Sequence, residues 1–257
     1  MKTGYDPRLQ SNVTVQEYHH HYGAKLDKDA KPRARPDVVC PACSETLHTV
    51  GETGALVDAT WAHDPSPSTW CPIKDSGAAK YVLLKPSRPV PSAAAAALRE
   101  SFFRNWPLHW SYTRSFADYA DIKGFSGFIR YADKTELWAY ATLQEWQLPY
   151  TFLATCEFPP STGKAIVLRR EWLRFRFDAK LRTIEDLWIR ILPGLRFLKL
   201  RYRKPRSGDP TASHYIDSET FILDPSWMST YSPSRPHAFA VRHMHAAFPA
   251  ELGLSAV

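Results

Sequence analysis

Three cysteines and one histidine have the spacing of a metal site. Cys40 and Cys43 form a Cys-x2-Cys pair, and His63 and Cys71 follow it along the chain. A Cys-x2-Cys turn directs two thiolates at one point, and a histidine with a third cysteine completes a tetrahedral set that suits zinc. The sequence therefore predicts one zinc ion bound by these four residues.

Other interpretations of the cysteines stay open. A Cys-x2-Cys pair also occurs in thioredoxin-like redox proteins, but the βαβ pattern that accompanies that motif is missing here. The cysteines could also be free thiols. His48 is a rival ligand to His63, although the alternation around it favours an exposed strand position. Cys156 stands alone in an apolar run, as a buried core residue does.

The elements around the four residues fit a closed site. Residues 45–50 and 55–62 are short runs with β-forming residues, separated by the turn 51–54, and predict a hairpin that returns His63 to the Cys-x2-Cys turn. The Pro- and Ser-rich loop 64–68 then brings Cys71 back. Because four protein ligands leave no open position for water or substrate, the zinc is expected to be structural.

The length predicts one main domain with a small appendage, and the pattern of predicted helices and strands makes the chain α+β, with a small zinc-binding module and a larger body. The expected parts are a flexible polar arm at 1–36, the zinc module with its linker at 37–90, and a nucleic-acid-binding body of helices and antiparallel sheet at 91–257. No apolar run is long enough to span a bilayer, and the first residues lack a signal-peptide pattern. We therefore expect a cytoplasmic protein.

Helices and strands alternate in the body. Helices are expected at 92–106, 111–121 and 133–146, with Pro107 and Pro149 as stop signals. Strands are expected at 150–158, 165–170 and 215–223, and further helices at 183–192 and 236–248.

Basic residues are concentrated in one segment. The chain of 257 residues has a formal net charge of +7, and residues 164–206 contain 14 Lys and Arg against 4 Asp and Glu. The rest of the chain is therefore slightly acidic. This asymmetry favours a polyanionic partner, while the alternative is a solvated sheet face with mixed ion pairs.

Two strands in that segment alternate apolar and cationic residues. Residues 172–177 and 198–203 would each bury one face and present cations, with Trp172 among them, on the other. Such a face suits phosphates and stacked bases. With the neighbouring basic loop 204–210, the candidate nucleic-acid contacts are Arg169, Arg170, Trp172, Arg174, Arg176, Lys199, Arg201, Arg203, Lys204 and Arg206.

Two groups of histidines have no assigned role. His19, His20 and His21 are adjacent, and adjacent side chains cannot all face one ion in a regular element, so a solvated or stacking surface is the simpler interpretation. His237, His243 and His245 could form a metal or phosphoesterase set, but no group of acidic residues at suitable spacing accompanies them.

The metal module resembles the zinc finger that precedes nuclease-like domains in CoiA-like competence proteins. The shared features are the Cys-x2-Cys turn, the hairpin, Trp61-Ala62-His63 and the final cysteine. The resemblance implies a zinc-containing DNA nuclease. A strand-borne aspartate followed by Glu-x-Lys, which would carry the cleavage, is not found in the sequence.

A wider part of the chain resembles the compact large-subunit proteins of type IV CRISPR effector complexes, which have an early zinc finger and a downstream α+β body. The matching stretches are 115–118, 137–138, 149–150 and 163–164. The resemblance implies a non-catalytic subunit, with other protein subunits as partners and no membrane. Such a subunit contacts the guide RNA end and the duplex DNA beside the target, and it helps to open that duplex. The alternatives are the nuclease and a zinc-stabilised scaffold that binds only protein.

Overall fold

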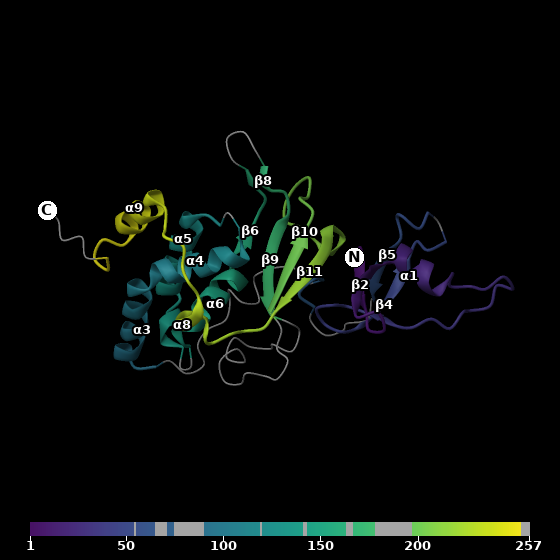
Figure 1. The fold of residues 1–257 in the computed structure, drawn as a ribbon, viewed down its shortest axis with the longest axis horizontal. Coiled ribbons are helices and arrows are strands. Elements are labelled where there is room, and N and C mark those ends of the chain that lie inside the picture. The colour runs from purple at the N-terminus through teal and green to yellow at the C-terminus, as the bar shows by residue number, and fades with distance from the viewer. Residues whose placement is uncertain are drawn as a thin grey trace.

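The chain folds into three layers (Figure 1): an N-terminal sheet with one helix, a central antiparallel sheet, and a layer of helices. The α+β class predicted from the sequence, with a Cys/His cluster near the N-terminus, is confirmed. The computed structural model describes residues 1–53, 55–64, 71–74, 90–118, 120–140, 143–162, 167–177 and 197–252.

The first layer is a five-stranded sheet in the order β2-β1-β3-β4-β5. Its strands are antiparallel to their neighbours. Helix α1 follows β2 directly, and a capping box between Thr14 and Glu17 fixes its first turn. The elements are β1 (Thr3–Asp6), β2 (Ser11–Thr14), α1 (Val15–Tyr22), β3 (Val38–Val39), β4 (Thr46–Val50) and β5 (Thr60–His63).

The prediction of a flexible arm at 1–36 is wrong for residues 3–22, which form two strands and a helix. Strands of four residues are too short to show a clear period in the sequence. Their pairing is also non-local: β1 pairs with β3, and the backbone of Met1 exchanges two hydrogen bonds with that of Trp61. These residues therefore belong to the metal module.

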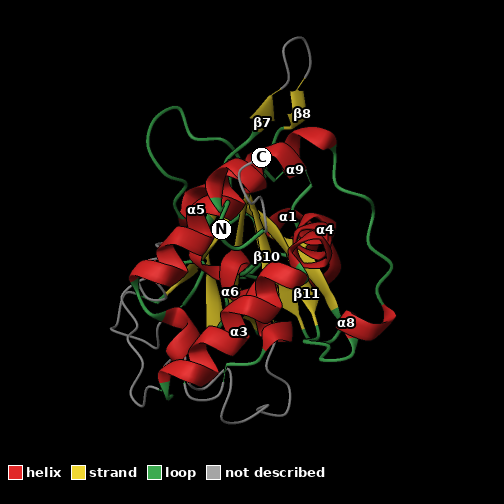
Figure 2. Ribbon diagram, turned by 90° about the vertical axis from the view of Figure 1, so that its left-hand side faces the viewer, coloured by secondary structure: helices red, strands yellow, loops and turns green. Residues whose placement is uncertain are grey.

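The helical layer is built from the middle and the end of the chain. Figure 2, viewed from that side, shows its helices in front of the central strands. None of the helices in the described part of the chain is long and apolar enough to cross a membrane. The helices are α3 (Ser92–Arg104), α4 (Trp106–Phe116), α5 (Ile122–Lys134), α6 (Leu148–Thr155), α8 (Trp227–Thr230) and α9 (Ala238–Ala247).

Two prolines begin helices that the sequence analysis expected them to end. Pro107 lies in the first turn of α4 and Pro149 in the first turn of α6, where the missing N–H has no helical partner to lose. The strand expected at 150–158 is therefore mostly helix α6. The helix expected at 133–146 is replaced by two short 3₁₀ turns, Leu137–Ala139 and Glu145–Gln147.

The central sheet has the order β11-β10-β9-β6 and is antiparallel throughout. A two-stranded hairpin, β7 (Ser161–Thr162) with β8 (Val167–Arg169), extends beside it (Figure 1). The predicted helix 183–192 lies outside the described residues. The sheet strands are β6 (Glu157–Phe158), β9 (Trp172–Phe177), β10 (Phe197–Tyr202) and β11 (Tyr215–Phe221).

Both faces of the central sheet are covered. Leu173, Phe175 and Phe177 pack into the core of the helical layer. Leu198 and Leu200 pack into a second core that contains the apolar residues of the N-terminal sheet. A strand buried on both faces cannot present a cationic face to solvent, and this fact governs what the arginines on these strands do.

Candidate metal centre and basic sheet end

The four predicted ligands come from a turn, a strand end and a returning loop. Cys40 follows β3, and the 40–43 turn is closed by hydrogen bonds from Ser44 N to Cys40 O (2.9 Å) and from Cys40 N to Glu45 O (2.7 Å). Ser44 has a φ of 62°, which lets the chain reverse there. His63 ends β5, where its register opposite Leu47 places it beside the turn.

These four side chains lie close together. One potential ligand atom from each of Cys40, Cys43, His63 and Cys71 lies within 4.8 Å of the others. The Sγ atoms of Cys40 and Cys71 are 3.7 Å apart, and Cys43 Sγ is 3.4 Å from His63 Nε2. The arrangement is compatible with one metal-ion site and is the single such group among the residues that the structure describes.

The cysteines of this group must lose protons before they can ligate a metal. The neighbouring Cys43 thiol, together with burial, raises the pKa of Cys40 to about 12. A metal ion therefore displaces protons when it binds, and its affinity falls as the pH falls. Cys156 lies outside the group, packed against the helical core, and burial raises its pKa to about 12.

His48, the rival ligand, points away from the group. Its side chain is 44% exposed and its Nδ1 lies 3.2 Å from Asp64 Oδ1. Strand β4 alternates, so His48 and Leu47 face opposite sides.

We therefore expect His63→Ala to lower the metal content of the purified protein sharply, and His48→Ala to leave it at the wild-type level. Elemental analysis of both variants measures this directly. Equal metal contents would show that His63 is not a ligand.

The metal group lies against the central sheet. Cys40 and Cys71 belong to the same buried cluster as Leu198, Leu200 and Tyr215. A hydrogen bond of 2.8 Å from Thr3 Oγ1 to Ile216 O also joins the N-terminal sheet to β11. Cys40 and Cys71 are thus part of the surface by which the N-terminal sheet packs on the body.

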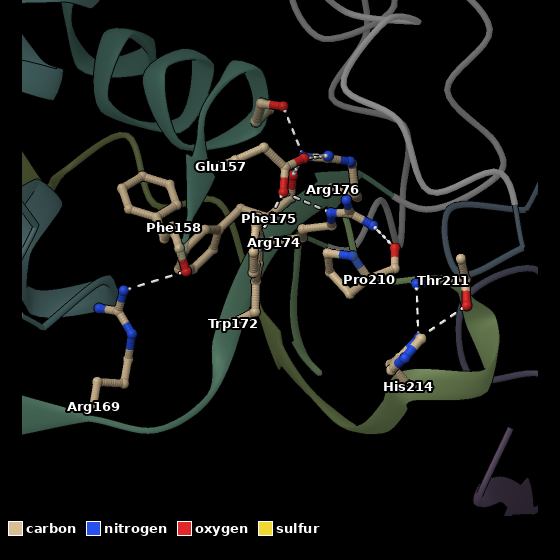
Figure 3. Close-up of polar contacts among 11 residues, drawn as sticks. Glu157, Phe158, Arg169, Trp172, Arg174, Phe175, Arg176, Pro210, Thr211 and His214 are labelled. Atoms are coloured by element: carbon tan, nitrogen blue, oxygen red, sulfur yellow. Dashed lines mark hydrogen bonds and ion pairs between the residues drawn. The ribbon is translucent and has the colours of Figure 1, made fainter. Parts of the chain in front are cut away.

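Arg174 and Arg176, expected on an exposed face, are buried. Their exposed fractions are 1% and 0%. Figure 3 shows both guanidinium groups at the carboxylate of Glu157, which accepts from Arg174 Nε at 2.6 Å and from Arg176 Nη2 at 2.8 Å. The expectation of exposed cations on β9 is wrong because the N-terminal sheet covers the face that they share with Leu198 and Leu200.

Trp172 and Arg169 also make internal contacts. Trp172 Nε1 donates to Glu157 Oε2 at 2.8 Å. The Arg169 guanidinium donates to the backbone oxygens of Asp118, Phe158, Pro159 and Glu171, two of them at 3.2 Å and that of Pro159 at 2.6 Å. Burial lowers the pKa of Arg169. These two side chains hold the body together rather than project from it.

On β10 the cations face the other way and pair with β11. Lys199 lies two residues after Phe197 on the strand, so both side chains are on the same face of the sheet, the one that packs against the helical layer. Its Nζ lies 3.7 Å from Glu219, and Arg201 Nε donates to Asp217 Oδ1 at 2.5 Å. The cations of β9 and β10 are thus on opposite faces, and the two strands form no common basic row.

Four of the ten predicted residues remain exposed and without an ion pair among the described residues: Arg170, Arg203, Lys204 and Arg206. They gather at one end of the sheet, because Tyr202 pairs with Trp172 where β10 ends and β9 begins. The ends of the basic loop are held by two hydrogen bonds. Arg174 Nη1 donates to Pro210 O at 2.7 Å (Figure 3), and Arg203 N donates to His214 O at 2.8 Å. We call these four residues the basic sheet end.

Glu157 is the residue that the sequence analysis missed. It lies near the end of the apolar run 150–158. An acidic residue in such a run is expected to be partly buried and therefore to pair with a cation, and this signal could have identified Glu157. His243 has an ordinary structural contact, since its Nε2 lies 2.8 Å from Ser126 Oγ. His19, His20 and His21 form the last turn of α1.

Comparison of the chain with known protein families, with curated proteins and with solved structures found no match.

Proposed function

We propose that this chain is a zinc-stabilised, non-catalytic nucleic-acid-binding protein. The observation that carries the proposal is the basic sheet end, where four cations share one end of the sheet and have no carboxylate partner among the described residues. Unpaired, exposed Arg and Lys side chains gathered in one place attract polyanions, and phosphates are the partners that their hydrogen-bond geometry suits.

Zinc is the metal that the ligand group fits best. Tetrahedral zinc with thiolate bonds of about 2.3 Å and imidazole bonds of about 2.0 Å requires roughly 3.8 Å between two sulfurs and roughly 3.5 Å between sulfur and nitrogen. The distances of 3.7 Å and 3.4 Å are close to these values. Because all four positions are filled by protein side chains, the zinc would stabilise the fold and take no part in a reaction.

The proposed function is nucleic-acid binding without cleavage. A metal-dependent nuclease needs carboxylates gathered around a divalent cation. Among the described residues, the Cys/His group is the one cluster that could hold a metal, and it contains no carboxylate. The narrower form of the proposal is a subunit of an RNA-guided CRISPR effector that contacts guide RNA and target-adjacent duplex DNA.

The double variant Arg203→Gln, Lys204→Gln tests the proposal. We expect its Kd for duplex DNA or RNA to rise roughly ten-fold at moderate salt. The magnitude of the slope of log K against log salt should fall by about 1.8, because fewer counterions are released on binding when two phosphate contacts are lost. Fluorescence anisotropy across a salt series measures both quantities.

The matched control removes two charges elsewhere. Arg104→Gln, Lys134→Gln changes exposed cations at the ends of α3 and α5, and it should leave affinity and slope close to wild type. If the wild type binds no nucleic acid at physiological salt, the protein-binding scaffold replaces this proposal. Purification from the native operon without nuclease treatment tests the narrower assignment, which requires a discrete RNA and companion subunits to co-purify.

A further inference from the structure

A surface groove of about 430 Å³ lies where α4, α5 and α9 meet. Helices α5 and α9 lie side by side in Figure 1 and are joined by the contact of Ser126 with His243. Both apolar and polar side chains line the groove. Its main lining residues are Trp110, Arg114, Asp121, Ser161, His237 and Phe239.

Phe239 is an aromatic ring left open to solvent at this groove. It lies in the first turn of α9 and is 56% exposed, whereas most other aromatic side chains of the helical layer are buried. Trp110 is buried and forms part of the floor. A flat aromatic surface that the fold does not cover is suited to stacking with a planar ligand.

The polar groups at the groove can both donate and accept hydrogen bonds. The Arg114 guanidinium lies over the Trp110 ring, with Cζ 5.8 Å from the centroid, and its buried Nε has no acceptor among the described residues. Asp121 is exposed and caps α5 by accepting from Lys123 N through Oδ1 (3.1 Å). Arg114 offers donors and Asp121 offers a second acceptor oxygen, and the edges of nucleobases carry the complementary groups.

The charges of the groove fit a neutral ring better than a phosphate. One arginine and one aspartate line it, so they largely cancel. A phosphate would be repelled by Asp121, whereas an exocyclic amine of a base would be attracted to it.

The groove also continues towards the basic sheet end. A second groove of about 300 Å³ shares Asp121 and Ser161 with it and is lined by Arg169. Arg169 binds the backbone of Asp118 and of Glu171, and the exposed Arg170 follows it in the chain. A nucleic-acid strand whose phosphates contact Arg170 and the other residues of the basic sheet end would therefore pass beside the groove.

We propose that this groove binds an unpaired nucleobase of a single-stranded segment. The base stacks on Phe239 and its edge faces Arg114 and Asp121. The inference rests on the proposed nucleic-acid binding, but it assigns a site other than the basic sheet end and a ligand other than the phosphate backbone, namely an unpaired base. It predicts a preference for a strand that contains unpaired bases over a fully paired duplex.

The test compares Phe239→Ala with the wild type on a single-stranded oligonucleotide and on the blunt duplex of the same sequence, by fluorescence anisotropy. We expect Phe239→Ala to weaken single-strand binding about ten-fold, which matches the loss of one stacked base, and to leave duplex binding unchanged. Phe239→Tyr keeps the ring and should retain the affinity. Because Phe239 is exposed, the variants should fold, and circular dichroism checks this.

Ile222→Ala is the matched control, since Ile222 is an apolar side chain that is 88% exposed at another place on the surface. Wild-type single-strand affinity in Phe239→Ala, together with weakened binding in Arg203→Gln, Lys204→Gln, would overturn the groove and leave the proposed function standing. Equal losses on single strand and duplex would overturn base stacking as well. A wild type that binds neither form would overturn the proposed function itself.

Discussion

Replacing Cys71 with serine is expected to lower the metal content from one ion per chain to background and to destabilise the whole protein. Cys71 is fully buried, and its sulfur lies 3.7 Å from that of Cys40. Structural zinc contributes on the order of 10 kcal/mol or more to the folding of small modules, so a loss of about 5 kcal/mol in the free energy of unfolding is a reasonable expectation here. For a chain of this length that loss corresponds to a fall in Tm of about 10–20 °C.

Cys156→Ser provides the matched control, because it makes the same chemical change outside the metal group. We expect its metal content to equal that of the wild type. A chelator added to the wild type should reproduce the destabilisation of Cys71→Ser. If the chelated protein unfolds at the wild-type temperature, the metal does not stabilise the fold.

The effect should reach beyond the metal module, because the module covers one face of the central sheet. Leu198, Leu200 and Tyr202 are fully buried against it. When the metal is lost and the module opens, this apolar face becomes exposed. Increased binding of a hydrophobic dye, at a temperature where the helices persist by circular dichroism, would identify that state.

The metal group was predictable because its geometry is set by short-range spacing. A Cys-x2-Cys turn is local, and a hairpin returns His63 to it in a register that neighbouring residues determine. The N-terminal strands were not predictable for the opposite reason. The pairing of β1 with β3 brings Tyr5 opposite Val39, and no local pattern encodes such a contact.

The strands β9 and β10 show what an alternating pattern predicts: which side chains share a face of the sheet, but not whether the opposite face is exposed. Alternation predicted that Leu173, Phe175 and Phe177 share a face, and they do pack together in the helical core. Alternation does not say what covers the opposite face. The pairing of Arg174 with Leu200 puts cations and leucines on one side, and a second layer buries both.

Prolines were misinterpreted because their meaning depends on position. In a helix interior Pro removes a hydrogen bond, but in the first turn its fixed φ favours the helix. The N-cap of α6 is Gln147, which is not a preferred N-cap residue. The N-cap of α4 is Asn105, a preferred type, but its side chain makes no capping hydrogen bond, and the sequence analysis did not use it as a start signal. Tertiary burial of the aromatic residues on α4 and α6 then decides the outcome.

Glu157→Gln is expected to cost about 3 kcal/mol in the free energy of unfolding. The replacement keeps the shape of the side chain and removes the charge that faces both Arg174 and Arg176, the nearest contact being 2.6 Å. Both buried guanidinium groups would then lose their ion pair with Glu157, and breaking a buried pair by removing one partner is costly. Urea unfolding at neutral pH measures the change.

The control is Glu219→Gln, which removes the exposed partner of Lys199 and should cost less than about 1 kcal/mol. Equal losses in the two variants would mean that the buried pairs add nothing beyond a surface pair. A triple variant that combines Glu157→Gln with Arg174→Met and Arg176→Met separates the effect of these residues on stability from their effect on the position of the basic loop. It should recover much of the lost stability, since apolar side chains can replace a buried ion cluster. Its nucleic-acid affinity should be lower than that of the wild type, because it lacks Arg174, which donates to the carbonyl of Pro210 and thereby holds the loop that carries Lys204 and Arg206.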